Sequence, residues 1–368
     1  MKKRLLIFHS ALAPYRVDFF NALGSKYDCT IIFLTKNNAN QNFNQDHLLK
    51  NATFKYEYLD IHFIVFHRNV NVGYWRKIKQ HNPDIIIANE FGLPLIASYI
   101  YKKITNSKFQ LYTMCDDSIP ICNNCKGIRL YSRNFFCKHI NGIITANKEV
   151  SSWYLTNTAI KRVCDFPIIR NEELYKKYLH LSIPIAQKYL VKWNLTGKSI
   201  IIFVGRLTRI KNLLALLRIY ASIKQNKQNS ILIIIGSGEQ NEYLKSEAIN
   251  LGITDNIIFA GRYEGNELLA WYNIADFLIL PSLHEAFGAV TAEALMAGCR
   301  AMVSSFAGSN ILVNKKNGII FNPKEKKDFT NALEYMIDSS QPTYKAVYRD
   351  SLLSITFKEK INELIKFL

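Results

Sequence analysis

The sequence lacks any run of 18 apolar residues and any low-complexity tract. A membrane-spanning helix needs about 20 consecutive apolar residues, so we expect none in this chain. The N-terminal apolar run Arg4–Phe8 is too short for the core of a signal peptide and is followed by His9 and Ser10, so we interpret it as a first strand and loop. Because 49% of the residues are hydrophobic and 12% are aromatic, the composition also argues against a disordered chain.

Cysteine is scarce: the chain has seven, an odd number, scattered along 368 residues. This argues against a disulfide framework and favours a reducing, cytoplasmic setting. Cys122 and Cys125 form a C-x-x-C pair, and Cys137 and His139 lie nearby, but no second pair follows at zinc-ligand spacing. We therefore predict no metal site.

Acidic residues are few, 29 against 47 Lys and Arg, which leaves a net charge of +18. Such an excess predicts a negatively charged partner, either a nucleic acid, an anionic membrane or a phosphorylated substrate, unless the basic surface is merely solvated. No nucleic-acid-binding motif is present and the cations are dispersed, so we predict no nucleic acid. The basic and aromatic segment Cys122–His139 has two interpretations: a patch for anionic lipid, or a helix with its apolar side in the core and its basic side in water.

The length of the chain predicts about two domains. Short buried runs alternate with helical patterns, which is typical of βαβ units and parallel sheets. The stretch from about Val163 to Ile185 has weak periodicity and is interpreted as the interdomain linker. The tail Tyr344–Leu368 has an amphipathic helical pattern. We expect domains at 1–170 and 171–345, with a C-terminal helix in 346–368. The clearest expected strands are Arg4–Phe8, Cys29–Phe33, Asp84–Ala88, Gln110–Met114, Gly142–Thr145, Ser199–Val204, Ile231–Ile235, Ile257–Ala260, Phe277–Leu280 and Ala301–Ser304.

The segment Pro281–Arg300 holds the most informative motif. Glu285 falls on a loop just past the buried strand Phe277–Leu280, and Glu293 falls in the first turns of a helix that starts near Val290. In α/β folds, ligands bind at the carboxyl ends of the strands. Free amides at a helix start favour an anion, and carboxylates accept hydrogen bonds from hydroxyls. The segment therefore predicts a ligand with both phosphates and hydroxyls.

This motif, Pro-Ser-x-x-Glu-Ala-Phe-Gly-x-x-x-x-Glu-Ala-x-x-x-Gly, resembles the signature of the retaining glycosyltransferase family 4, also called glycosyl transferases group 1, of GT-B fold. A Gly-Arg-Leu-x-x-x-Lys-Asn element that starts at Gly205 resembles the same family. The resemblance covers most of the second half of the chain and the first half only loosely. It implies an α/β fold of two Rossmann-like domains that face each other across a cleft, a first domain for the acceptor and a second for the nucleotide sugar. The C-terminal helix would cross back onto the first domain.

The resemblance also implies roles for residues. Arg206 and Lys211 would stabilise the departing diphosphate, because fixed cations offset charge that develops in the transition state. Glu285 would accept hydrogen bonds from donor-sugar hydroxyls, and Glu293 from the ribose diol. The remaining residues expected to bind the nucleotide sugar lie at the helix start and in the loops after three strands; they are Phe287, Gly288, Ala289, Val290, Gly205, Gly236, Gly238, Arg262 and Tyr263.

In the first half, Pro14 and Arg16 match a Pro-x-Arg element of the family, which would place Arg16 on the acceptor side; the alternative is a plain surface arginine. Family members often carry a His-Asp pair after the strand that here ends near Met114. In this chain Cys115 stands where the His would be, and Asp116 is the candidate to reach a sugar or acceptor hydroxyl. The alternative is that Asp116 or Asp117 caps a turn.

The predicted function is therefore a retaining, metal-independent, hexosyltransferase-type glycosyltransferase without a cofactor. Its partners would be a nucleotide-diphosphate sugar, a lipid-linked saccharide acceptor and an anionic membrane surface. It would act in cell-surface polysaccharide biosynthesis, in the cytoplasm or at the inner face of the membrane. The alternatives are an epimerase or hydrolase of nucleotide sugars on the same fold, a non-catalytic basic protein that binds nucleic acid or membrane, and a scaffold that has lost activity.

Overall fold

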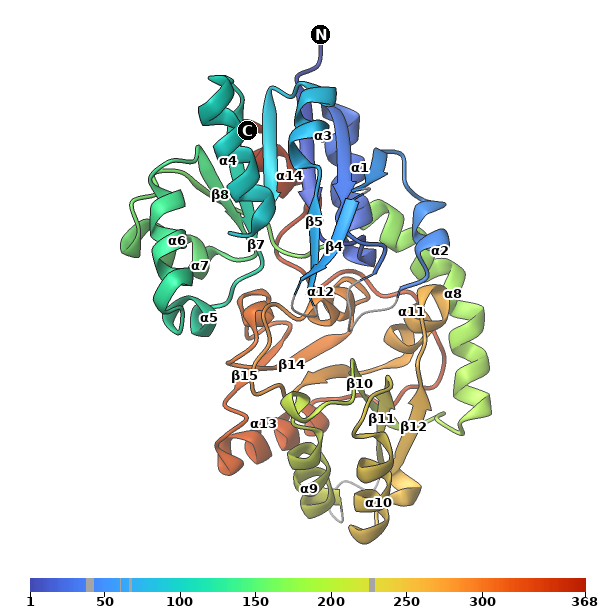
Figure 1. Cartoon of the computed structure of the whole chain (residues 1–368). Coiled ribbons are helices and arrows are strands. Elements are labelled where there is room, and N and C mark those ends of the chain that lie inside the picture. The colour runs from blue at the N-terminus through green and yellow to red at the C-terminus, as the bar shows by residue number, and fades with distance from the viewer. Residues whose placement is uncertain (38–42, 60, 66–67, 225–228) are drawn as a thin grey trace. The chain divides into compact units, whose positions relative to one another are not determined.

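The computed structural model describes residues 1–37, 43–59, 61–65, 68–224 and 229–368. The chain forms two compact units, Met1–Ile168 together with Lys358–Leu368, and Ile169–Phe357. Each unit has a parallel β-sheet with helices on its faces (Figure 1). In the described residues no helix is both long and apolar enough to cross a membrane.

The first unit is built on a seven-stranded sheet of order β3-β2-β1-β6-β7-β8-β9 in which all paired strands are parallel. A separate antiparallel pair, β4 (Ile61–Val65) and β5 (Arg68–Val72), lies outside this sheet. The strands of the sheet are β1 (Arg4–His9), β2 (Asp28–Phe33), β3 (Lys55–Tyr58), β6 (Ile85–Asn89), β7 (Gln110–Cys115), β8 (Gly142–Thr145) and β9 (Val163–Asp165). The α-helices of this unit are α1 (Val17–Lys26), α2 (Gln45–Leu49), α3 (Tyr74–His81), α4 (Leu93–Thr105), α5 (Ile119–Asn123), α6 (Gly127–Cys137), α7 (Lys148–Asn157) and α14 (Phe357–Phe367).

The second unit is built on a six-stranded parallel sheet of order β12-β11-β10-β13-β14-β15. Its strands are β10 (Ser199–Val204), β11 (Ser230–Ile235), β12 (Ile257–Gly261), β13 (Phe277–Leu280), β14 (Arg300–Ser304) and β15 (Gly318–Phe321). Its α-helices are α8 (Glu172–Lys192), α9 (Leu213–Lys224), α10 (Asn241–Asn250), α11 (Gly265–Ile274), α12 (Ala289–Met296) and α13 (Lys326–Asp338).

The strands are almost continuously apolar because helices cover both faces of each sheet. In β10 and β11 every residue is buried, and in β1 every residue but Arg4 is buried. An alternating pattern would indicate a sheet with one face in water, and a continuous one is typical of a buried parallel sheet. The predicted α/β architecture with two Rossmann-like domains is confirmed.

Both sheets reverse their strand order beside the first strand of the unit. The chain runs outward from β1 to β2 and β3, then returns to the other side of β1 to form β6. It repeats this course from β10, which lies between β11 and β13. Such a switch point leaves a crevice at the carboxyl ends of the two central strands, where ligands of open α/β sheets bind.

The stretch from about Val163 to Ile185, interpreted as the interdomain linker, contains the division between the two units, after Ile168, but most of it is regular structure and not a linker. Val163–Asp165 is β9, and Glu172–Lys192 is the single helix α8, which contains Pro184. Proline removes a helical hydrogen bond, which is why the sequence indicated a break. A tertiary contact anchors this part of α8, because the side chain of Asn273 donates to the Leu179 carbonyl at 3.0 Å, in the turn before the proline. The helix also packs closely on α11.

The tail is helical only over Phe357–Phe367, so the prediction of a helix from Tyr344 is wrong for its first part. Residues 344–356 run as an irregular segment on the second unit, where Arg349 donates to the Ala275 carbonyl at 2.8 Å. Helix α14 (red in Figure 1) lies among the elements of the first unit. There Lys360 bonds Asp165 at 2.8 Å.

The segment Cys122–His139 fits neither of its interpretations fully. It forms α5 and α6, and Arg133 is buried in an ion pair with Asp117 at 3.0 Å. Ile128 and Tyr131 are instead 88% and 75% exposed. The expectation of a buried apolar side and a hydrated basic side is therefore wrong for Arg133, which pairs with the internal carboxylate of Asp117, and for the exposed Ile128 and Tyr131.

Candidate active site

The loops at the switch point of the second unit bring two predicted catalytic residues together. The loop after β10 ends in the short 3-10 helix Arg209–Lys211, and the loop after β13 attaches to it through the Leu283 amide, which donates to the Ile210 carbonyl at 2.9 Å. Lys211 and Glu285 consequently form a hydrogen-bonded ion pair, with side chains 12% and 20% exposed. The Lys211 ammonium and the Glu285 carboxylate are therefore in contact in the loops that follow β10 and β13.

Glu285 is held in place by its own backbone. It forms a parallel bridge with Ala307, in the loop after β14. Its amide donates to the Phe306 carbonyl at 3.2 Å, and its carbonyl accepts from the Gly308 amide at 3.1 Å. The loop after β14 therefore supports the Glu285 loop, which fixes where the carboxylate points.

Gly288 lets helix α12 begin where it does. Its φ is +93°, and a Cβ atom there would lie 2.7 Å from Cδ2 of Leu280. Phe287 is buried before it, and Ala289 and Val290 are half-buried in the first turn of α12. The N-terminus of this helix carries a partial positive charge, which favours an anion.

Glu293 lies one turn into α12, half-buried, and two tyrosines hold it. The Tyr272 hydroxyl donates to Oε2 of Glu293 at 3.1 Å, and the Tyr175 hydroxyl donates to its carbonyl at 3.0 Å. Burial raises the pKa of Glu293, and the nearby Arg170 opposes that rise. Neither tyrosine could be predicted from the sequence as a site residue, because buried aromatics on helices are usually core residues.

The glycine loops after β10 and β11 approach each other too closely for a side chain. Gly236 has a φ of +150°, and a Cβ atom there would lie 1.8 Å from the Gly205 carbonyl oxygen. The Leu207 amide bonds the Ser237 carbonyl at 2.9 Å, which joins the two loops. Gly238 follows in the same loop, and exposed Arg206 follows Gly205. This part of the site is therefore built largely from backbone.

The loop after β12 lies farther from the Lys211–Glu285 pair. β12 is two strands away from β10, roughly 10 Å at the usual strand spacing. Arg262 is exposed and ion-paired with Glu264, and the Tyr263 ring packs against Trp271 with centroids 5.8 Å apart.

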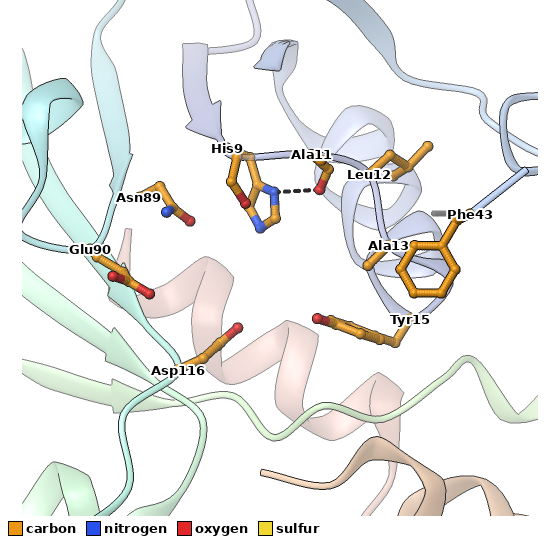
Figure 2. A pocket seen from close by; sticks show the side chains of 10 residues that line it. His9, Ala11, Leu12, Ala13, Tyr15, Phe43, Asn89, Glu90 and Asp116 are labelled. Carbon is orange, nitrogen blue, oxygen red and sulfur yellow. Dashed lines mark hydrogen bonds between the residues drawn. The ribbon is translucent and has the colours of Figure 1, made fainter. Parts of the chain in front are cut away.

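The first unit has a pocket of its own at its switch point. This cavity of about 170 Å³ lies at the carboxyl ends of β1 and β6. Figure 2 shows the His9 ring, the Tyr15 hydroxyl and the carboxylates of Glu90 and Asp116 directed toward the same space. The lining residues are His9, Ser10, Ala11, Leu12, Ala13, Tyr15, Phe43, Asn89, Glu90 and Asp116.

Asp116, which lines this pocket, pairs with Arg16, which is buried outside the lining; both were predicted from the sequence. Nη2 of Arg16 donates to the two Asp116 carboxylate oxygens at 2.6 and 2.7 Å. The Arg16 side chain is 3% exposed, so it is not a plain surface arginine, whereas Asp116 is 34% exposed and lines the cavity. Asp117 is turned away, bonded to Arg133 and Tyr154. No side-chain cap is present at the start of α5, so neither aspartate caps that turn.

His9 and Glu90 are pocket residues that the sequence analysis missed. Each lies at the carboxyl end of a strand in the sheet, His9 as the last residue of β1 and Glu90 directly after β6. Polar residues that follow buried strands are a usable signal, but β1 and β6 are far apart in sequence and only the topology makes them neighbours. Burial, with Arg16 nearby, lowers the pKa of His9 to about 4, so its ring is neutral at pH 7.

In the part of the chain that the structure describes, no three His, Cys, Asp or Glu side chains gather as a metal site would need. Cys122, Cys137 and Cys115 are instead packed in one hydrophobic cluster of the first unit.

Comparison with known proteins gives matches of two kinds. The chain is 38% identical over 128 residues to an uncharacterized glycosyltransferase of Methanocaldococcus jannaschii, a match that covers 34% of this chain and 33% of that protein. It is 29% identical over 258 residues to alpha-monoglucosyldiacylglycerol synthase of Streptococcus pneumoniae, covering 65% and 55%. The matched segments thus span a third of the first relative and just over half of the second.

Among solved structures, HepE of Anabaena in complex with UDP superposes with a TM-score of 0.72 at 16% identity and covers 93% of this chain and 92% of that one. This likeness confirms the predicted fold, two Rossmann-like domains of GT-B type. Residues 187–350, which make up most of the second unit, match the family model described as Glycosyl transferases group 1.

Proposed function

We propose that this protein is a retaining glycosyltransferase that moves a hexose from a nucleotide-diphosphate sugar to a saccharide acceptor. The observation that carries the proposal is the Lys211–Glu285 pair at the switch point of the family-matched unit, beside the start of α12. A cation, a carboxylate and a helix N-terminus at one point suit a ligand that has a diphosphate and hydroxyls.

The donor is held by the second unit. Arg206 and Lys211, with the amides at the start of α12, stabilise the charge that develops on the departing diphosphate. The Lys211 ammonium has three N–H donors, so it can contact a phosphate and keep Glu285 in position. Glu285 accepts from hydroxyls of the donor sugar, and Glu293, fixed by Tyr272, accepts from the ribose diol. The UDP in the HepE structure supports a nucleoside diphosphate as the common part of the donor.

The reaction proceeds with retention and without a metal or cofactor of the protein's own. The acceptor hydroxyl attacks from the same face as the leaving group, and its proton passes to the leaving phosphate oxygen. The anomeric C–O bond to phosphate breaks as the new glycosidic bond forms. The protein cations take the place that a divalent metal has in other transferases.

The acceptor is held by the first unit, in the pocket that Asp116 lines, and is lipid-linked. Two observations support a membrane surface as its location. Ile128 and Tyr131 are exposed on α6 beside the exposed cations Lys126 and Arg129, a combination that suits anionic lipid. The pneumococcal relative is named for a glycolipid product. We place the protein at the cytoplasmic face of the membrane, in cell-surface polysaccharide assembly.

A thermal-shift screen of the purified chain against UDP, GDP, ADP, CMP and their sugars tests the donor site. A ligand that binds only the folded state raises the unfolding temperature by mass action. We expect a shift with one nucleoside diphosphate, and loss of that shift in Glu293→Ala. If none of these compounds shifts the unfolding temperature at millimolar concentration, the proposal is wrong. Conversion of the nucleotide sugar at an unchanged rate without any acceptor would instead indicate an epimerase or a hydrolase.

A further inference from the structure

A second cavity adjoins the polar pocket of the first unit. It has a volume of about 220 Å³ and shares two lining residues, Asn89 and Glu90, with the first. The remaining lining residues are mostly apolar; they are Leu34, Tyr74, Gly92, Leu93 and Pro94. Glu90 therefore stands on the ridge between a polar cavity and a more apolar one.

The backbone of Glu90 is held in an unfavourable conformation. Its φ is +54°, in the left-handed region that side chains other than glycine, asparagine and aspartate seldom adopt. The Glu90 amide donates to the Met114 carbonyl at 2.8 Å, and the Thr113 hydroxyl donates to the Glu90 carbonyl. A strained backbone that its neighbours maintain is a feature found at functional sites.

The Glu90 carboxylate has no hydrogen bond or ion pair with any other residue that the structure describes. Desolvation in the pocket raises its pKa, the neighbouring charges of Asp116 and Asp117 add to that rise, and the charges of Arg129 and Arg133 oppose it. This carboxylate is thus free to accept hydrogen bonds from a ligand in either cavity.

His9 supplies a second acceptor to the same pocket. The ring is 6% exposed, and Nδ1 lies 3.0 Å from the Ala11 carbonyl, so Nδ1 must carry the proton and donate. Nε2 of the neutral ring is then an acceptor only. Figure 2 shows this second ring nitrogen turned toward the middle of the pocket, where no hydrogen bond to another described residue satisfies it.

The charges in the two cavities distinguish ligand classes. No lysine or arginine is among the described residues that line either cavity. Arg16 pairs with Asp116, whereas Glu90 makes no ion pair with a described residue, and the opposing charges of Arg129 and Arg133 act on it from outside the lining of both cavities. An anionic group would be repelled here, in a chain whose net charge is +18. Hydroxyl groups, by contrast, would donate to Glu90 and to Nε2 of His9.

We propose that Glu90 and His9 select an acceptor whose reacting sugar is uncharged, with its hydroxyls in the polar cavity and the apolar continuation of the acceptor in the second. This inference rests on the proposed function and narrows its acceptor: the phosphate of a lipid-linked acceptor, if it has one, lies outside both cavities.

Binding of hexyl glycosides to the purified full chain, followed by ligand-observed NMR titration, tests the proposal. The probes are hexyl glucoside, galactoside and mannoside, with hexyl glucuronide as the anionic match to the glucoside. We expect at least one neutral glycoside to bind, and the glucuronide to bind roughly tenfold or more weakly, because like charges repel across the pocket. Glu90→Gln should weaken the neutral glycoside by roughly tenfold, since it loses hydrogen bonds to a charged acceptor.

Two further variants distinguish the loss of contacts with the ligand from a loss of folding. Glu90→Gly relieves the left-handed backbone, so it should lose binding without a lower unfolding temperature. Glu149→Gln changes an exposed glutamate of the same unit on α7 and should bind as the wild type does. Absence of binding by every neutral glycoside, equal binding of the glucuronide, or full binding in Glu90→Gln would each overturn the proposal.

The nucleotide shift separates this proposal from the proposed function. Glu90→Gln should keep the wild-type thermal shift with the nucleoside diphosphate, since Glu90 belongs to the other unit. If the wild type shows no nucleotide shift but binds neutral glycosides through Glu90, the proposed function fails and the acceptor pocket remains. If the nucleotide shift is present and the glycoside results fail, only the acceptor inference is lost.

Discussion

The two units have sheets of one topology, but their switch points are built from different groups. In the second unit the central loops carry glycines whose backbones touch, a helix N-terminus and the Lys211–Glu285 pair. In the first unit the corresponding crevice is lined by side-chain acceptors, His9, Glu90 and Asp116. Backbone amides and cations suit phosphate, whereas carboxylates and a neutral imidazole suit hydroxyls. The sheet topology therefore determines where a binding site lies, and the residues of the loops determine which ligand it suits.

The largest expected effect concerns the second unit, whose switch point is the one that suits phosphate. Replacing Lys211 or Arg206 with alanine should lower turnover by roughly 10²–10³-fold, as loss of one fixed charge stabiliser typically does. Steady-state kinetics with the donor found in the thermal-shift screen measures it. Lys245→Ala removes an exposed lysine of the same unit and serves as the control, with turnover unchanged. A rate near that of the wild type in both site variants would remove the assigned role.

The second prediction concerns the contact between the glycine loops. Gly236→Ala would place a methyl group against the Gly205 carbonyl, so the loops must separate, at a cost of roughly 3 kcal/mol in the free energy of unfolding. Gly252→Ala is the matched control, because Gly252 also has a positive φ, +66°, but a Cβ atom there meets nothing within 4 Å. It should cost only about 1 kcal/mol. Urea unfolding of both variants measures the loss in the free energy of unfolding for each. Equal losses would mean that the loops have room to move apart.

The third prediction concerns the first unit, whose pocket suits hydroxyl groups, and its expected effect is the smallest of the three. The pKa of His9 is lowered to about 4 by burial and by Arg16, against the opposing charge of Asp116, while in the unfolded chain it is about 6.5. As pH falls below 6.5 the unfolded chain therefore binds a proton that the folded protein does not. The free energy of unfolding should fall by roughly 2 kcal/mol between pH 7 and pH 5 from this residue alone.

Urea unfolding at pH 7 and pH 5 in the wild type and in His9→Gln isolates that contribution, since other titrating groups are common to both. The variant should lose less stability on acidification than the wild type. The same pH dependence in both proteins would mean that His9 is protonated in the fold, and its role as a neutral acceptor would fail.

Three site residues of the second unit could be predicted because they lie in one short stretch. Glu285, Gly288 and Glu293 follow a single strand within nine residues, so local signals for strand, loop and helix were enough to place them. Which partner each would meet was not accessible: Lys211 is 74 residues from Glu285, and Tyr272 is 21 from Glu293. Those contacts depend on the order of strands in the sheet.

The pocket of the first unit shows the opposite case. His9, Glu90 and Asp116 each follow a different strand, and only the order β1-β6-β7 makes the three strands neighbours. Asp116 was found through a family resemblance, whereas the other two had only the local signal of a polar residue at the end of a buried strand. The helix that contains Pro184 was missed for a similar reason, because the Asn273 side chain that anchors it comes from another helix.

By itself, the sequence determined what local patterns encode: the alternation of buried strands and amphipathic helices, and the two motifs that carry Lys211, Glu285 and Glu293. These depend on interactions between residues close in the chain. Only the tertiary structure decided which loops meet at each switch point, that Arg16 is buried beneath Asp116, and that Glu90 stands between two cavities. Such features arise from contacts between residues far apart in sequence, and no local pattern contains them.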